Sequence, residues 1–263
     1  MRPRLVVVIL ALAAAGARPP DPLAMARRLY NENKFDEALT AAEQAEALPA
    51  TISSARLVIG RIRLERYRRT ADDADLEAGR NALQALDPRA LSQREKLELQ
   101  IGIAELMYFD DRFGPAAEIL EPILDSSPAL GPNAHDRALD WWATALDRQA
   151  QAVAVQERAP IYERIGGRME RELQRVQASV PANYWIAAAA RGAGDLDRAM
   201  AAASAAWMRA PLASDGGTAL REDIDRLVTQ AIVPDRAAKL TTRDRRQTIA
   251  GMIAEWEAFK KNW

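Results

Sequence analysis

The feature that most constrains this chain is a set of small residues that recur at helical spacing. Ala38, Ala42 and Ala45 lie four and three residues apart, so they share one face of a helix. Small side chains on such a face allow a second helix to approach closely. The same layout returns around Ala116 and around Ala199, in each case with a phenylalanine or leucine three residues earlier and a proline beyond. The sequence therefore predicts closely packed pairs of helices.

Composition and charge agree with a helical fold and narrow the range of partners. The chain has 263 residues, of which 49% are hydrophobic and only 6% aromatic, and alanine, leucine and arginine are abundant. These residues lose little conformational entropy in helices, which favours an all-α fold. The 36 basic and 37 acidic residues nearly cancel, leaving a formal charge of -1. We therefore expect no nucleic-acid partner, since binding to nucleic acid depends on excess positive charge.

Each of these three units reads as a helix, a short polar turn and a second helix. The clearest pieces are residues 35–38 (FDEA) and residues 194–199 (GDLDRA). This pattern resembles the tetratricopeptide repeat, a helix pair that stacks into superhelical arrays. The resemblance implies an all-α, right-handed solenoid of about five tetratricopeptide-like pairs over residues 22–211.

Two of the five units are irregular. In the second, we expect a long turn between Tyr67 and Asp75, followed by a helix whose small face carries alanines. In the fourth, we expect the first helix to reach about residue 158 and the second helix to start at Pro160, a residue that is favourable at a first helical position. The adjacent Gly166 and Gly167 should weaken or kink that second helix.

Residues 212–263 change character and predict two C-terminal capping helices. A solenoid exposes the apolar face of its last repeat unless further helices cover it. We expect the first stripe to end at Pro234 and the second helix to be capped by Thr241 and Thr242. The alternative is a partner-binding tail that ends in Trp263. The two apolar stripes are Leu220, Ile224, Leu227, Val228 and Ile232, and then Ile249, Met252, Ile253, Trp256 and Phe259.

The N-terminus is typical of a secretory signal. Arg2 and Arg4 precede an apolar run over residues 5–15, and small residues at 15–17 offer a cleavage site. The run is much shorter than the roughly twenty residues that a bilayer span requires. We therefore predict a Sec-type signal peptide over residues 1–17, export to the periplasm or secretion, and no stable membrane span after cleavage. An uncleaved N-terminal anchor is the alternative.

The sequence offers little for catalysis. It has no cysteine and a single histidine, His135, so multi-histidine and thiolate metal sites are excluded, and we expect neither metal nor cofactor. His135 lies among polar residues at an expected helix start, which favours a solvated or capping role. The aspartates at 72–75 and at 110–111 lie at expected turns, where solvation explains them. We therefore expect a protein that is not an enzyme.

The resemblance also implies where a partner would bind, because the first helix of each pair lines the concave groove in this family. The paired lysines and asparagines with which some members hold a carboxylate are absent. The arginines of residues 61–69 are followed by acidic residues, which favours a charged solvent face. The groove candidates by register are Arg27, Tyr30, Asn31, Glu105, Tyr108, Phe109, Tyr184 and Arg191.

These observations lead to one hypothesis and two alternatives. The chain is expected to be an exported scaffold that binds a protein or peptide in its groove. One alternative is a structural subunit of a cell-envelope assembly, which a large apolar patch outside the groove would indicate. The other is a small carboxylate-dependent hydrolase, which two buried acids with raised pKa values in one cleft would indicate. The sequence indicates neither the partner nor the oligomeric state.

Overall fold

The computed structural model describes residues 21–241 and 244–263, in which all regular structure is helical. The expected signal peptide (1–17) and Thr242 lie outside these residues. The α-helices are α1 (Pro22–Asn31), α2 (Phe35–Glu46), α3 (Ile52–Thr70), α4 (Asp73–Gln84), α5 (Gln93–Phe109), α6 (Phe113–Leu120), α7 (Pro132–Ala152), α8 (Val155–Arg175), α9 (Val180–Gly192), α10 (Leu196–Arg209), α11 (Thr218–Leu227), α12 (Val233–Lys239) and α13 (Arg245–Asn262).

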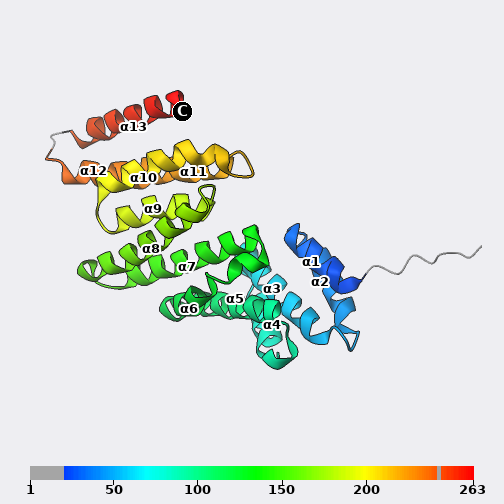
Figure 1. Cartoon of the computed structure of the whole chain (residues 1–263). Helices are drawn as coiled ribbons and strands as arrows, with labels where there is room; N and C mark the ends of the chain where they lie inside the picture. The colour runs from blue at the N-terminus through cyan, green and yellow to red at the C-terminus, as the bar shows by residue number, and fades with distance from the viewer. Residues whose placement is uncertain (1–20, 242–243) are drawn as a thin grey trace, which may run out of the picture.

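Each helix packs mainly on its neighbours in the sequence, and α1 and α13 lie at opposite ends of the array (Figure 1). The odd-numbered helices also touch in succession, from α1 on α3 through to α9 on α11. The buried apolar residues form four successive clusters, across α1–α3, α3–α5, α5–α9 and α9–α13. The core therefore runs along the chain rather than around one centre. The prediction of an all-α fold is confirmed.

Three of the turns between helices have the same construction. Asn33, Asp111 and Gly194 adopt left-handed backbone angles, with φ of 60°, 58° and 84°. In each turn, the next residue donates its N–H to the carbonyl five residues earlier, which ends the first helix in a compact way. The second helix then starts two residues after the left-handed one. These are the turns α1–α2, α5–α6 and α9–α10, which belong to the three units that share a sequence pattern.

The recurrent alanines lie at the packed face, as predicted. Ala38, Ala116 and Ala199 each follow the left-handed residue by five positions, and all three have no solvent-exposed surface. The next same-face positions are also buried, with at most 2% of their surface exposed: Ala42, Ala45, Leu120, Ile123, Ala203 and Ala206. The alanines at these positions of α2 and α10 allow the paired helices to come close, whereas α6 and the turn that follows it place Leu120 and Ile123 there.

The second pair differs from the prediction. The long turn is wrong: α3 continues to Thr70, Ala71 takes the left-handed conformation (φ 54°), and α4 begins at Asp73. The close contact uses glycines rather than alanines. A methyl group added at Gly60 would lie 2.6 Å from a Leu83 side-chain carbon, and one at Gly79 would lie 3.2 Å from the Gly60 carbonyl oxygen. The small face of α4 is therefore shifted along the helix from the alanines that we expected.

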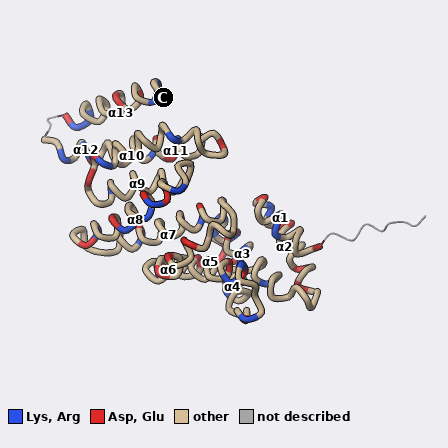
Figure 2. The backbone as a smooth tube through the Cα atoms, viewed as in Figure 1, with Lys and Arg blue, Asp and Glu red and all other residues tan. Residues whose placement is uncertain are grey.

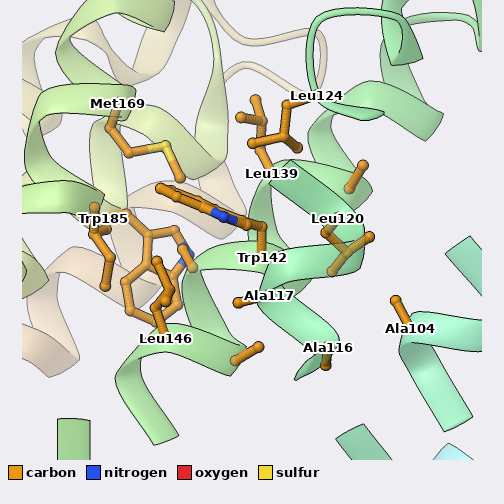
Figure 3. Packing of buried hydrophobic residues seen from close by; sticks show 14 of the residues in the cluster. Ala104, Ala116, Ala117, Leu120, Leu124, Leu139, Trp142, Leu146, Met169 and Trp185 are labelled. Atoms are coloured by element: carbon orange, nitrogen blue, oxygen red, sulfur yellow. The ribbon is translucent and has the colours of Figure 1, made fainter. Parts of the chain in front are cut away.

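The fourth pair also has different boundaries. Helix α7 ends at Ala152, before residue 158, and α8 starts at Val155, five residues ahead of the expected Pro160. Helix α8 then runs through Pro160 and the glycine pair to Arg175 without interruption. Both helices contribute to the largest apolar cluster, which spans α5 to α9 and in which the side chain of Met169 extends toward the fully buried ring of Trp142 (Figure 3).

The C-terminal helices cover the end of the array. The first expected stripe is buried, but Pro234 does not end it, because a π-helical turn (Val228–Ile232) carries α11 directly into α12. Helix α13 is capped by Asp244 rather than by a threonine. Its Trp256 packs on Trp207 of α10 at 5.6 Å between ring centroids and donates a 2.8 Å hydrogen bond to Asp225 of α11.

The repeated left-handed turn predicts opposite effects for two substitutions. Gly194→Ala should lower the free energy of unfolding by about 1 kcal/mol, because an alanine is strained at positive φ. No atom lies within 4 Å of the added methyl group, so a steric clash does not contribute. Asp111→Gly should raise the same quantity by about 0.5 kcal/mol, since it removes that strain. Urea unfolding monitored by circular dichroism tests both, and equal effects at the two sites would contradict the shared geometry.

The position of α13 predicts unequal roles for its two tryptophans. Trp256→Ala should cost about 3–5 kcal/mol, because it opens a cavity at a side chain that is only 1% exposed. Trp263→Ala should change stability by less than about 0.5 kcal/mol, because Trp263 is 65% exposed. Thermal unfolding of the two variants provides the comparison. Equal, small effects would favour the alternative in which α13 is a tail rather than a cap.

Candidate functional site

A cavity of about 280 Å³ lies where the odd-numbered helices α1, α3, α5 and α7 meet. Its wall has a charged part and an apolar part, a combination typical of small-ligand sites. Its volume is close to the lower limit of roughly 300 Å³ for such sites. The lining residues are Arg27, Tyr30, Asn31, Val58, Arg61, Arg94, Glu98, Ile101, Leu130, Gly131, Pro132, Asn133, Ala134, Arg137 and Ala138.

Long-range polar contacts close the ring of helices around this cavity. Arg137 of α7 donates hydrogen bonds from its Nη1 to the Tyr30 hydroxyl of α1 at 3.1 Å and to Glu65 of α3 at 3.0 Å. Arg27 of α1 donates to Glu95 of α5 at 2.7 Å. Hydrogen bonds led by those of Ser54 and Ser92 overcome the effect of burial and hold the pKa of Glu95 at about 2. Helix α1 is therefore tied to α5 and α7 as well as to its sequence neighbours.

Three of the four arginines in the cavity wall have acidic partners. Arg27 pairs with Glu95, Arg94 with Glu98 at 3.1 Å, and Arg137 with Glu65, as described above. Such pairing satisfies most of the charge of each guanidinium. The fourth arginine is different, and its surroundings decide what the cavity can bind.

Arg61 of α3 forms no hydrogen bond or ion pair with any other residue that the structure describes. Its guanidinium carbon lies 5.1 Å from the ring centroid of Tyr30, a cation–π distance. Its Nε atom is buried without a partner. Burial opposes its positive charge, but the acidic groups of Tyr30 and Glu105 keep its pKa above the ordinary value. Arg61 is thus a partly buried cation whose donors face no protein acceptor.

Glu105 of α5 is a buried acid with an unpartnered oxygen and a raised pKa. Its side chain is 2% exposed and its Oε1 atom has no hydrogen-bond partner. Burial raises its pKa to about 7, and the charge of Arg61 opposes this shift. The neighbouring Glu65 contributes to the rise, while Arg137 and Arg68 oppose it. Near neutral pH, Glu105 is therefore divided between its neutral and its charged form.

The N-terminus of α7 adds a further electropositive element to the wall. Gly131, at φ 102°, occupies the capping position and supplies no side chain. Pro132 follows, and the backbone N–H groups of Asn133 and Ala134 have no partner in the described part of the chain. Unpaired N–H groups and the helix dipole favour a negative charge at such a position.

The eight predicted groove residues separate into four groups in the structure. Arg27, Tyr30 and Asn31 line this cavity. Glu105 is buried but close enough to Arg61 to share its electrostatic environment. Tyr108 and Phe109 lie outside the lining and contact Trp141 edge-on, at 4.8 and 5.6 Å between ring centroids.

Tyr184 and Arg191 line a second cavity, of about 430 Å³, between α7, α8, α9 and the start of the C-terminal helices. Its charged side chains, those of Asp147, Arg158, Arg191 and Asp235, all have hydrogen-bond partners within the protein. The Tyr162 hydroxyl donates to Asp147 at 2.9 Å, and Arg191 donates to Asp235 at 2.8 Å. This cavity therefore presents satisfied rather than free donors.

The expectation of a solvated or capping His135 is wrong. His135 does lie in the first turn of α7, but it is only 6% exposed. Its Nδ1 lies 2.7 Å from the hydroxyl of Ser127, and its Nε2 lies 3.1 Å from the carboxylate of buried Glu172. Ser127 has no solvent-exposed surface. The three side chains therefore form an internal polar contact between the segment before α7, α7 itself and α8.

Sequence reasoning missed Arg61, Arg94 and Arg137. Arg61 was expected on a solvent face because acidic residues follow it, but it lines the cavity. Its position relative to the following turn explains this: Arg61 lies ten residues before the left-handed Ala71, as Ile101 lies before Asp111 and Tyr184 before Gly194. All three line cavities. The misplaced second turn concealed this correspondence.

Within the described part of the chain, neither the charge distribution nor a membrane-spanning helix nor a metal-binding group adds to this site. Figure 2 shows acidic and basic residues interleaved along the helices rather than divided into two regions. No helix in residues 21–241 or 244–263 is long and apolar enough to cross a membrane. Within the same residues, no group of three histidine, aspartate or glutamate side chains is arranged to hold a metal ion.

Comparison with protein families, with characterised proteins and with solved structures finds no match to this chain.

The raised pKa of Glu105 predicts a pH-dependent stability. The folded state retains a proton on Glu105 up to about pH 7, whereas the unfolded chain releases it near 4.5. The contribution of Glu105 to the free energy of unfolding is therefore fully present below its pKa in the unfolded chain. This contribution, up to about 3 kcal/mol, is lost as the pH rises toward 7.

Glu105→Gln should remove this loss. The difference in free energy of unfolding between wild type and Glu105→Gln, measured by urea unfolding from pH 4.5 to 8, isolates the group from other titrations. A difference that does not vary with pH would contradict the raised pKa.

Proposed function

We propose that this chain is an exported, non-catalytic binding protein of tetratricopeptide-like helix pairs, which holds a protein or peptide partner on the surface of its first helices. In this proposal the pairs are α1–α2, α3–α4, α5–α6, α7–α8 and α9–α10, over residues 22–211, and they form a right-handed superhelix. Helices α11 to α13, within residues 212–263, cap its end.

The shared turn supports the repeat. Three helix pairs have a left-handed residue in the turn and a fully buried alanine five positions later. The contacts of each odd-numbered helix with the next are those expected when pairs stack in register. The successive apolar clusters fit an array in which each unit buries its face on its neighbours.

The observation that carries the binding function is that first helices line both cavities. The first cavity is formed by α1, α3, α5 and α7, and α7 and α9 contribute most of the second. Five of the eight predicted groove residues lie in these walls. A surface built from equivalent positions of successive repeats is the usual binding surface of such arrays.

Catalysis is less well supported. The serine of the Ser127–His135 contact is fully buried, so a substrate does not reach its hydroxyl. At the first cavity, Glu105 has a raised pKa, but its neighbour Glu65 is held by Arg68 and Arg137. Burial also raises the pKa values of Asp136 and Asp140 on α7, but Ser179 and Trp185 donate hydrogen bonds to them and neither acid lines either cavity. The pair of raised acids that would indicate a carboxylate-dependent hydrolase is therefore not assembled at either cavity.

A structural subunit of an envelope assembly is also less well supported. The large hydrophobic side chains that are exposed in the described residues belong to segments spread from the end of α2 to the C-terminus, rather than to one helix face: Leu48, Val155, Val176, Met208, Leu212, Leu240 and Trp263. Single exposed apolar residues are normal on soluble surfaces.

The proposed export rests on the sequence of residues 1–17. Two arginines, an apolar run of about eleven residues and small residues follow in the order of a secretory signal. The periplasm or the exterior of the cell is the compartment in which a partner is to be sought.

Site-specific crosslinking in the native cell tests the function. A photoreactive amino acid is placed at Asn31 or Asn133, both exposed at the first cavity, or at the control positions Gln44 of α2 and Glu118 of α6. The cavity positions should capture the same partner, and the second-helix positions should not. The proposal fails if no position yields a product, or if all four yield the same one.

A further inference from the structure

The cavity between α1, α3, α5 and α7 has the chemistry of a specific ligand site. We propose that it binds one amphipathic monocarboxylate, a single anionic carboxylate on an apolar body, with Arg61 as the residue that contacts the carboxylate. The ligand is a free organic acid or the terminal residue of a peptide, which share this chemistry. The inference stands apart from the groove function, although a peptide end in the cavity would anchor the partner proposed above.

The charge balance sets the number of anionic groups at one. Arg27 pairs with Glu95, Arg94 with Glu98, and Arg137 with Glu65, a carboxylate that also pairs with Arg68. Arg61 is left without an ion-pair partner among the described residues, and its guanidinium has several donors available. A guanidinium matches a carboxylate in geometry and can bind it through two parallel hydrogen bonds. One unpaired cation calls for one negative charge.

The preorganisation of Arg61 supports the same conclusion. The ring of Tyr30 lies against its guanidinium, and the Tyr30 hydroxyl is itself held by Arg137. Tyr30 is 8% exposed, so the stacking partner is fixed in the interior. A cation held on an aromatic face loses little further freedom when an anion binds. The unpaired N–H groups at the start of α7 add a favourable potential.

The remaining wall determines the body of the ligand. Val58, Ile101, Leu130, Pro132 and Ala138 supply apolar surface to the same cavity. A volume of about 280 Å³ leaves room for one short acid or one residue, rather than an extended peptide. The hydrogen bonds from Arg137 to Tyr30 and from Arg27 to Glu95 join the helices that surround the cavity. The ligand is therefore small, apolar and singly charged.

Glu105 couples binding to protons. Its carboxyl shares the environment of Arg61, so a bound anion favours the neutral form of Glu105 by repulsion. Binding should therefore take up a proton near neutral pH and become stronger as pH falls from 8 to 6, where a simple carboxylate stays ionised. The other titratable groups that face Glu105 are Glu65 and Arg68 of α3, Arg137 of α7 and the phenol of Tyr30 of α1. Glu98 of α5 acts on Arg61.

Calorimetric titration of the full chain with octanoate is the first test, with octan-1-ol as the uncharged control. Octanoate should bind with a dissociation constant of about 0.1–1 mM, as expected for a ligand of this size. Octan-1-ol should bind at least about tenfold more weakly, because it lacks the charge. A second arm compares N-acetyl-leucine, which stands for the end of a peptide, with its uncharged amide. The proposal is supported if either carboxylate binds more tightly than its uncharged counterpart. The carboxylate that does so shows whether the ligand is a free acid or a peptide end.

Matched variants assign the contact. Arg61→Gln should weaken carboxylate binding by at least about tenfold. Arg56→Gln, on the same helix but paired with Glu46 outside the cavity, should bind like the wild type. Circular dichroism establishes that both variants fold. Glu105→Gln gives a second measurement that does not depend on Arg61→Gln: the severalfold gain in wild-type affinity between pH 8 and pH 6 should disappear.

The proposal is overturned if neither carboxylate binds, if the uncharged controls bind equally well, or if folded Arg61→Gln retains full affinity. These outcomes are distinct from failure of the groove function. Crosslinking at Asn31 without carboxylate binding would leave the groove proposal standing and remove this one. Carboxylate binding without any crosslinked partner would do the reverse.

Discussion

The left-handed turn between paired helices is the constraint on which the rest of the structure depends. It reverses the chain in three residues, and it fixes the rotation of the second helix so that a small residue five positions later meets the first helix. Once the pairs are close, the first helices of successive pairs are also brought into contact. The cavity walls follow from that arrangement, since the residues ten positions before three of the turns, Arg61, Ile101 and Tyr184, each line a cavity.

Helix α1 would be the least secured element of such an array if it contacted only its sequence neighbours. The hydrogen bonds of Tyr30 with Arg137 and of Arg27 with Glu95 give it partners 107 and 68 residues away in the sequence. These groups are partly buried, where hydrogen bonds that involve charged groups are stronger than at the surface. The same contacts form part of the cavity, so the residues that hold the N-terminal end of the fold also define its most distinctive site.

Much of the fold could be predicted from the sequence, and the exceptions have physical causes. Alanines at spacings of four and three marked three helix pairs correctly, because small buried residues leave a visible periodic pattern. The second pair was misread because Ala71 occupies a left-handed position that usually favours glycine or asparagine, so the turn had no signature. Pro234 was expected to end the first C-terminal helix, but a π-helical turn over Val228–Ile232 leads directly into α12, which contains Pro234. The sequence has no pattern that predicts such a turn.

The candidate site was predictable only in part. Register identified Arg27, Tyr30 and Asn31, but it could not reveal which charges find partners. That depends on contacts between residues far apart in the sequence, such as Arg27 with Glu95. Arg61 and His135 were both assigned to solvent from their polar neighbours, and both are turned inward by packing. Local polarity describes a segment, whereas burial depends on which helices meet it.

The division of the core into four successive clusters has a consequence for how the molecule opens. In a protein with one central core, unfolding is close to all-or-none, whereas neighbour-by-neighbour packing allows one end to exchange its amide protons while the other stays protected. The helices of the α1–α3 cluster can therefore unfold locally as one cooperative unit, while the helices around Trp142 stay folded and their amide protons protected. Because the first cavity spans that boundary, occupancy of the cavity and closure of the N-terminal end are thermodynamically linked.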